Sequence, residues 1–387
     1  MPSDNSLEAR VRTRLADLEA ANLLRVMRSP FGVDLSSNDY LTLSTHPRIT
    51  AAFAAGVWAE GAGSTGSRLL RGARRTFDAV EQQFAAFKGT ERALFLSSGY
   101  LANIAALTTL PETGDVIFSD ALNHASLIDG ARLSRADRVV FPHSDVAALA
   151  RLIDTTPCSG TRFVVVESLF SMDGDEAPLA AYAELCRRTG AALIVDDAHA
   201  VGVYGEKGSG LVEAAGVSRD VLLSINPAGK ALGVGGAFLA GPAWVVEYLV
   251  QRARPFVFST APPPAMGLAL SESLRVIHDE PERRAKLRAL SSRFRAQLAD
   301  AGYPVLPGTS HIVPVVIGSN EAALAVAAAL QSEGFDVRAI RPPTVPAGTA
   351  RLRVSVNTGL DDTTLDRFVR VLEIAAKEMG ACSPASS

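Results

Sequence analysis

The sequence predicts an α/β protein with a mostly parallel central sheet, followed by a smaller α+β region. From about residue 90, short apolar runs rich in strand formers alternate with helical stretches, and this alternation stops after Pro281. Strands that alternate with helices pair in parallel and are buried on both faces, and ligands then bind at their carboxyl ends. A chain of 387 residues also exceeds the size at which one core usually keeps growing, which favours two lobes.

The first part of the chain contains six runs with the character of buried strands and three helical stretches between them. The predicted strands are 93–96, 139–141, 163–166, 192–195, 221–225 and 236–240. The predicted helices are 101–110, 146–153 and 179–189. Uninterrupted apolar runs of this length are typical of strands that are covered on both faces.

After Pro281 the pattern predicts a long amphipathic helix and a small α+β lobe. Four apolar residues share one face of that helix: Leu287, Leu290, Phe294 and Leu298. A strand at 312–317, a helix at 321–333, a strand at 351–356 and a helix at 363–379 are expected to follow. We therefore expect an N-terminal helix and linking segment (1–45), a large domain (46–280) and a small C-terminal domain (281–387).

The amino-terminal segment predicts an amphipathic helix that docks on the protein. Its apolar face consists of Leu7, Val11, Leu15 and Leu18. Charges run through this segment and it has no apolar centre, which argues against a signal peptide. The uncharged stretch 231–246 is short for a membrane span and is broken by glycine and proline.

Charge and cysteine content exclude several classes of protein. The net charge of −3 comes without any block of like charges, so we expect no nucleic-acid partner and no membrane partner. The three cysteines, Cys158, Cys186 and Cys382, lie far apart and predict neither a disulfide framework nor a metal site. This usage is typical of a reducing compartment, and we expect a cytoplasmic protein.

Lys230 is the first candidate for chemistry, in the glycine-rich loop SINPAGKALGVGGAF. A lysine that forms a Schiff base needs partial desolvation and close approach of the backbone. Asp196 ends a predicted strand, where a carboxylate can hold a pyridinium nitrogen protonated, and His199 could bond a ring hydroxyl. The alternatives are a surface lysine, a loop-capping aspartate and an Asp–Asp–His metal site. The metal site is the weakest, because no HExxH motif or further ligand cluster occurs.

Two glycine-containing segments are candidate phosphate sites. Ser98, Gly99 and Tyr100 open a predicted helix, whose free N–H groups and dipole suit a phosphate, although an ordinary helix cap has the same pattern. GAGSTG at 61–66 matches GxGxxG, but the residues before it predict a helix. A dinucleotide site needs that motif directly after a buried strand, so we reject a dinucleotide cofactor.

Eight segments in order resemble the α-oxoamine synthases, a family of fold-type I pyridoxal-phosphate (PLP) enzymes. They are LSSNDYL (35–41), GSTGSRLLRG (63–72), LSSGYLANIAAL (96–107), NHASLIDGARLS (123–134), ESLFSMDGD (167–175), VDDAHAVGVYGEKGSG (195–210), GKALGVGGAFLAG (229–241) and ARLRVS (350–355). The resemblance implies a fold-type I PLP transferase with a large PLP-binding domain, working as a homodimer with shared active sites. The second and fourth segments resemble most the branch that joins L-alanine to pimeloyl-CoA or pimeloyl-ACP in biotin biosynthesis.

The resemblance also implies which residues hold the cofactor. Lys230 would carry pyridoxal 5'-phosphate and later move the Cα proton. Asp196 would pair with the pyridine nitrogen and His199 with the ring hydroxyl. His124 would stack on the ring face, and Ser171 would lie on the side of the ring hydroxyl.

Further residues are implied for the phosphate and the substrates. The segment 98–100 would hold the phosphate, with Thr260 contributed by the partner subunit. Arg353 would bind the carboxylate of the amino acid. Asn38 and Arg25 would line the substrate pocket, and no metal is implied.

This chain departs from the family pattern at Pro227, where relatives usually have the threonine that bonds the phosphate. Proline offers neither a hydroxyl nor an N–H, so either Ser224 or Asn226 compensates for the lost bond or PLP binds less tightly. A short stretch between Arg28 and residue 34 also leaves the placement of Arg25 open. Pro227 keeps one alternative open, a synthase with another amino acid or acyl chain. A PLP aminotransferase and a non-catalytic subunit with this fold are further alternatives, and the presence of the chemical residues Lys230, Asp196, His124 and His199 argues against the last of these.

Overall fold

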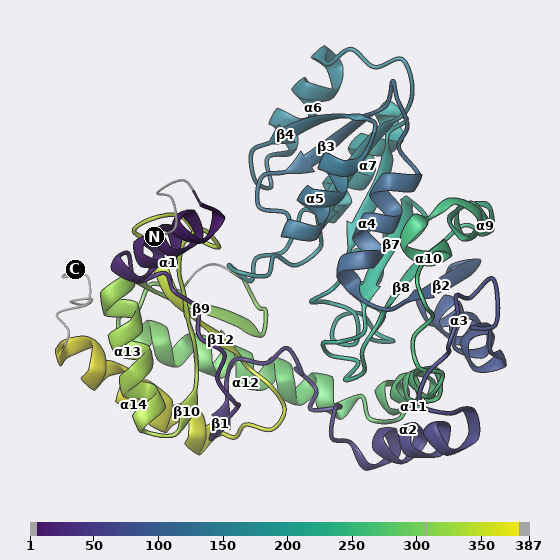
Figure 1. Cartoon of the computed structure of the whole chain (residues 1–387). Helices are drawn as coiled ribbons and strands as arrows, with labels where there is room; N and C mark the ends of the chain where they lie inside the picture. Colours follow the sequence, from purple (N-terminus) through teal and green to yellow (C-terminus); the bar gives the residue numbers. More distant parts are fainter. Residues whose placement is uncertain (1–5, 306–307, 379–387) are drawn as a thin grey trace.

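In the computed structural model, which describes residues 6–305 and 308–378, a seven-stranded sheet forms the centre of the larger lobe (Figure 1). Its strands are β2 (Arg92–Leu96), β3 (Val116–Asp120), β4 (Asp137–Phe141), β5 (Arg162–Glu167), β6 (Ala192–Asp196), β7 (Val221–Pro227) and β8 (Ala237–Gly241). The order is β2-β8-β7-β6-β5-β3-β4, and only β8 runs antiparallel to its neighbours. The predicted mostly parallel sheet is therefore confirmed.

Two apolar layers bury the sheet on both faces. Residues that alternate along each strand belong to different cores: Ile194 and Ile225 pack on the α4 (Gly99–Thr109) side, and Val195 packs on the other. The remaining helices of this lobe are α2 (Pro47–Glu60), α3 (Arg75–Lys88), α5 (Ala125–Leu133), α6 (Val146–Thr155), α7 (Leu179–Thr189), α8 (Leu211–Ala214), α9 (Ala243–Arg252), α10 (Arg254–Val257) and α11 (Ala265–Asp279). The GAGSTG segment follows helix α2, which confirms the rejection of a dinucleotide motif.

All six predicted strands are present, but the sequence pattern did not reveal β3. Its sequence is VIFSD, in which only three apolar residues precede Ser119 and Asp120. All five residues are nevertheless buried, because β3 lies between β4 and β5. The position of a strand inside the sheet, and not its composition alone, decides its burial.

The smaller lobe has the predicted α+β character. It contains α12 (Glu282–Asp300), β9 (Ile312–Gly318), α13 (Asn320–Ser332), β10 (Phe335–Asp336), β11 (Ala339–Ile340), β12 (Ala350–Ser355) and α14 (Asp362–Glu378). Strands β11, β12 and β9 form an antiparallel sheet, and the four predicted apolar residues of α12 are buried. Strand β1 (Val33–Asp34) pairs with β10, which ties the amino-terminal segment to this lobe. The domain limits at 45 and 280 stay predictions; residue 379 of the last predicted helix, and Cys382, lie outside the described residues.

Helix α1 (Leu7–Ala20) forms as predicted, but the expectation that its apolar face docks on the chain is wrong. No residue of α1 is buried, and Leu7 remains 66% exposed. The helix lies beside α13 (Figure 1), where Asn22 donates to Glu321 at 3.1 Å. Apolar spacing determines which residues share a face, but it does not supply a partner for that face. Among the described residues, no helix has the length and apolar character needed to cross a membrane.

Candidate active site

The side chains of Lys230, His199 and Asp196 meet at the carboxyl ends of β6 and β7. Lys230 lies in the loop between β7 and β8, and its Nζ is 3.0 Å from His199 Nε2. Asp196 is the last residue of β6 and is 3% exposed. Burial lowers the pKa of both Lys230 and His199, and it raises the pKa of Asp196 against the opposing effect of Lys230. The site therefore favours a neutral imidazole beside the amine.

Tyr40, a residue that the sequence did not single out, orients His199. Its hydroxyl donates to Asn38 Oδ1 at 2.9 Å and lies 2.6 Å from His199 Nδ1. It also accepts from Arg353 Nη2 at 3.3 Å. Because a tyrosine hydroxyl has one hydrogen, which goes to Asn38, His199 Nδ1 must carry its own hydrogen. His199 Nε2 then has a free lone pair that faces Lys230.

Arg353 brings the smaller lobe into the site. It belongs to β12, is 8% exposed, and donates to the Ser171 carbonyl at 2.6 Å and to Ser355 Oγ at 2.8 Å. Its third partner is Tyr40. Within residues 6–305 and 308–378, no carboxylate lies within ion-pair distance of this guanidinium. A buried cation without an anion is suited to bind one, because the pairing would offset its desolvation.

A chain of hydrogen bonds joins His124 to Asp196 through two further residues. Asn103 Nδ2 donates to Asp196 Oδ2 at 2.8 Å and to Ser126 Oγ at 2.7 Å. Ser126 Oγ lies 2.7 Å from His124 Nδ1, and since that ring nitrogen accepts the Ser126 N–H at 3.2 Å it carries no hydrogen, so the Ser126 hydroxyl donates to it. The sequence pattern did not indicate that Asn103 and Ser126 belong to the site. A polar residue inside the otherwise apolar helix LANIAAL was the available signal.

The amino end of α4 has free hydrogen-bond donors, as expected of a phosphate site. Ser98 caps the helix by accepting from Leu101 N–H at 3.2 Å. In the part of the chain that is described, the N–H groups of Gly99 and Tyr100 have no partner. Pro227 packs directly against Gly99, since a Cβ on Gly99 would lie 2.6 Å from Pro227 Cγ. The helix dipole and the two free N–H groups fit an anion at this end.

Ser224 and Asn226 do not point to that helix end. Successive residues of a strand face opposite sides of the sheet, and Pro227 shares the α4 side with Ile225. Ser224 and Asn226 therefore face away from α4, where Asn226 Nδ2 donates to Ser224 Oγ at 3.0 Å. The expectation that either residue replaces the missing threonine hydroxyl is wrong for this geometric reason.

Asp197 forms a separate ion pair with Lys88. Its carboxylate is 2.9 Å from Lys88 Nζ and accepts from Ser168 Oγ at 2.5 Å. Among the described residues, no group of three or more histidine, cysteine or acidic side chains could hold a metal ion. The loop that carries Ser171 is held by His143, whose ring nitrogens lie 2.9 Å from Asp120 and 2.8 Å from Asp175.

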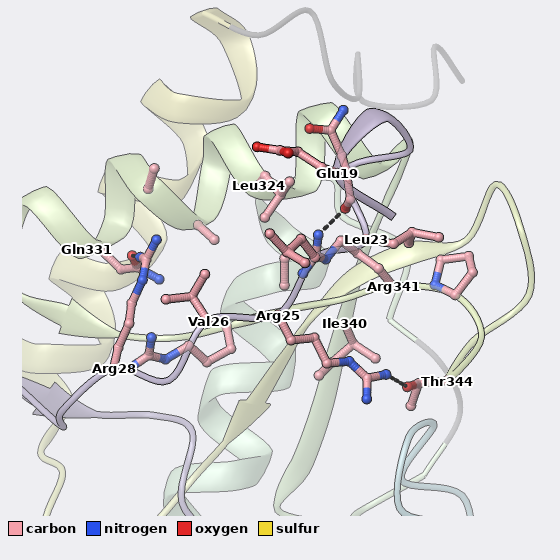
Figure 2. A pocket seen from close by; sticks show the side chains of 17 residues that line it. Glu19, Leu23, Arg25, Val26, Arg28, Leu324, Gln331, Ile340, Arg341 and Thr344 are labelled. Carbon is pink, nitrogen blue, oxygen red and sulfur yellow. Dashed lines mark hydrogen bonds between the residues drawn. The ribbon is translucent and has the colours of Figure 1, made fainter. Parts of the chain in front are cut away.

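Two predicted residues lie away from this network within the chain. Thr260 is exposed in the segment after α10, where Ala261 N–H donates to the Gly66 carbonyl at 2.9 Å. Arg25 lines a cavity of about 740 Å³ between the segment after α1 and the smaller lobe (Figure 2). Its Nη2 is 3.4 Å from Thr344 Oγ1, and Arg28 and Arg341 also line this cavity.

Residues 32–372 match the family model described as aminotransferase class I and II. The chain belongs to this family. It is 47% identical over 388 residues to 8-amino-7-oxononanoate synthase of Burkholderia cenocepacia (strain HI2424), with 95% of each chain covered. It is 48% identical over 353 residues to the synthase of the same name from Anaeromyxobacter dehalogenans (strain 2CP-1 / ATCC BAA-258), with 91% of this chain and 88% of the relative covered.

Solved structures of this aminotransferase family agree closely with the fold. Serine palmitoyltransferase of Sphingomonas wittichii superposes with a TM-score of 0.91 at 30% identity, covering 98% of this chain and 99% of the other. Another structure, a serine palmitoyltransferase (SPT) with a PLP internal aldimine, gives a TM-score of 0.92 at 27% identity, covering 98% and 100%. The family, the fold class and the PLP cofactor expected from the sequence are confirmed.

Proposed function

We propose that the chain is a PLP-dependent acyltransferase that joins L-alanine to a pimeloyl thioester. The products are 8-amino-7-oxononanoate, CO2 and the free thiol of coenzyme A or acyl carrier protein, as in biotin biosynthesis. The relatives at 46–48% identity named 8-amino-7-oxononanoate synthase support this choice of substrates. The observation that carries the reaction class concerns Arg353. Its guanidinium is buried, has no ion pair among the described residues, and lies next to the hydrogen-bonded series Tyr40–His199–Lys230.

The residues of the site fit pyridoxal phosphate, which when bound supplies an electron sink for the carbanion formed at the amino-acid Cα. The N–H groups of Gly99 and Tyr100 would hold its phosphate. Asp196 would hold the proton on the ring nitrogen, and its own orientation comes from Asn103 Nδ2 and from Ala198 N–H at 3.0 Å. Lys230 would supply the amine that binds the cofactor.

The protein's own residues then orient the amino acid and move its proton. Arg353 binds the carboxylate, which directs the Cα hydrogen toward the amine of Lys230. Lys230 Nζ takes that proton, and burial, with a smaller contribution from Arg353, lowers the pKa of the amine against the opposing effects of Asp196 and Glu167. His124, which Ser126 holds in place, would stack on the face of the cofactor ring. The cofactor would allow the Cα of the amino acid to bond to the thioester carbonyl with release of the thiol. Loss of CO2 and return of a proton to Cα, for which Lys230 Nζ is the nearby donor, would then give the amino ketone.

We also propose a homodimer in which Thr260 of each subunit completes the site of the other, with the cytoplasm as its location. Within one chain, Thr260 is exposed and has no contact with the Lys230 network among the described residues. The segments near residues 64 and 262 are joined by a 2.5 Å hydrogen bond from Ser64 Oγ to the Pro262 carbonyl, which gives the exposed segment a defined shape.

The deciding experiment is a substrate panel with product analysis by mass spectrometry. The holoenzyme is incubated with L-alanine, glycine or L-serine, each with pimeloyl-CoA or palmitoyl-CoA, and CO2 and free thiol are measured. L-alanine with pimeloyl-CoA should give 8-amino-7-oxononanoate in preference to every other pair. Faster reaction of L-serine with palmitoyl-CoA would assign another branch, and formation of pyruvate without CO2 would indicate transamination.

A further inference from the structure

Glu167 is a buried carboxyl group of the site, and none of the proposed catalytic steps uses it. It ends β5 as Asp196 ends β6, and the two residues are register partners in the parallel ladder. Register partners on adjacent parallel strands point to the same face, which here is the face covered by α4. Glu167 is 2% exposed, and its Oε1 has no hydrogen-bond partner among the residues that the structure describes.

The two neighbouring carboxyl groups differ in the number of donors that they receive. Asp196 accepts from Asn103 Nδ2 on one oxygen and from Ala198 N–H on the other. From the described part of the chain, Glu167 receives only the backbone N–H of His124. Two buried carboxyl groups on adjacent strands do not both ionise at low cost. The one with fewer donors holds the proton, because donors stabilise the charged form.

The described residues that act most strongly on the pKa of Glu167 are three charged side chains and one backbone N–H. Asp196 lies on β6 and Asp120 on β3, Lys230 lies in the loop after β7, and His124 precedes α5. Burial has the largest effect and, with Asp196, raises the pKa of Glu167 to about 8, while Lys230 and the His124 N–H oppose this. Glu167 is therefore neutral at pH 7 and titrates in the range where an amine changes its own protonation.

We propose that Glu167 is a proton-holding group of the active site that controls the protonation of Lys230. A proton passes between the Lys230 ammonium and the Glu167 carboxylate, so the products are a free amine and a neutral acid. The free amine is the form that a carbonyl requires of its nucleophile. Ionised Glu167 raises the pKa of Lys230, and neutral Glu167 removes this effect. The inference rests on the proposed function only in taking Lys230 as the reactive amine.

The first test observes the proton of Glu167 directly in the holoenzyme. With ¹³C-labelled glutamate, infrared spectra should contain a carbonyl stretch of a protonated carboxyl group at pH 7. The band should disappear as the pH rises through about 8 and should be absent from Glu167→Gln. A wild-type protein without this band at pH 7 would overturn the proposal.

The second test follows Lys230 in the apoenzyme by its rate of reductive methylation against pH, with peptide mass spectrometry as the readout. In Glu167→Gln the side chain cannot ionise, so Lys230 should titrate at lower pH and react about threefold to tenfold faster at pH 9, as expected for a shift of up to about one pKa unit. Glu184→Gln is the matched control, because Glu184 is 62% exposed on α7. Equal titration of Lys230 in the wild type and Glu167→Gln would refute the inference. Both tests omit the substrates, so a failed substrate panel stays a separate result.

Discussion

Replacing Pro227 by threonine tests how the site holds a phosphate. Pro227 ends β7 and touches Gly99, the first residue of α4. Because of its place in the ladder, the lack of an N–H at Pro227 removes no backbone hydrogen bond to β8. Ala228 N–H donates to the Gly236 carbonyl at 2.8 Å, so the pair Pro227↔Ala237 beside it is a non-hydrogen-bonded pair of the antiparallel ladder. A threonine at this position can therefore add a hydroxyl at the α4 end without disturbing β8.

The expected gain is that of one hydrogen bond to a charged group. Such a bond contributes about 1.5–3 kcal/mol, which corresponds to roughly tenfold to hundredfold in affinity. Loss of proline also adds unfolded-state entropy of about 0.4–1 kcal/mol, which lowers the free energy of unfolding. Pro227→Val has the same branching and the same entropy effect but no hydroxyl, so the difference between the two variants isolates the hydrogen bond.

The assay is dialysis of the three holoenzymes against PLP-free buffer, with the visible absorbance of the bound cofactor as the readout. Pro227→Thr should lose PLP more slowly than Pro227→Val and more slowly than the wild type. Equal loss from the threonine and valine variants would refute the reasoning. It would mean that the N–H groups of Gly99 and Tyr100 already bind the phosphate fully.

Three further predictions concern the lysine, the dimer and an ion pair. Borohydride reduction should attach the pyridoxyl group to Lys230, and a label on Lys88 or Lys207 would contradict the site. Sedimentation should give a homodimer, because Thr260 lies outside the site of its own chain; an active monomer would exclude shared sites. Burial opposes ionisation of His143, but its bonds to two aspartates raise its pKa to about 10. The contribution of protonated His143 to the free energy of unfolding is therefore complete below about pH 6.5 and is lost as the pH rises toward 10. The free energies of unfolding of the wild type and His143→Gln, measured with urea, should converge over that interval. A difference between them that grew with pH would disprove the raised pKa of His143.

Much of the fold could be predicted because parallel strands have a strong local signal. Strands β5 and β6 each contain four consecutive apolar residues, which is typical of burial on both faces. Strand β3 lacks that signal, since Ser119 and Asp120 are buried by neighbouring strands and by polar partners. Helix α1 shows the converse case, in which a clear apolar face has no partner within the described chain.

Local sequence also determined the central residues of the site. Lys230 lies in a glycine-rich loop, and Asp196 and His199 follow the end of a buried strand, so each has a signal within a few residues. These signals follow from short-range requirements: backbone freedom near a ligand, and the position of a polar side chain at a strand end. The PLP cofactor and the family followed from the order of such segments.

Only the tertiary structure decided which distant side chains meet. Tyr40 bonds His199 across 159 positions of the chain, Asn103 bonds Asp196 across 93, and Glu167 becomes the neighbour of Asp196 through the strand register. The alternation of side chains along β7 directs Asn226 away from the helix end that it was expected to serve. A buried hydrogen bond depends on distances set by packing, and these distances are not functions of sequence separation. The sequence therefore indicated the chemical role of Lys230, Asp196 and His199, whereas the tertiary structure determined their hydrogen-bond partners and protonation states.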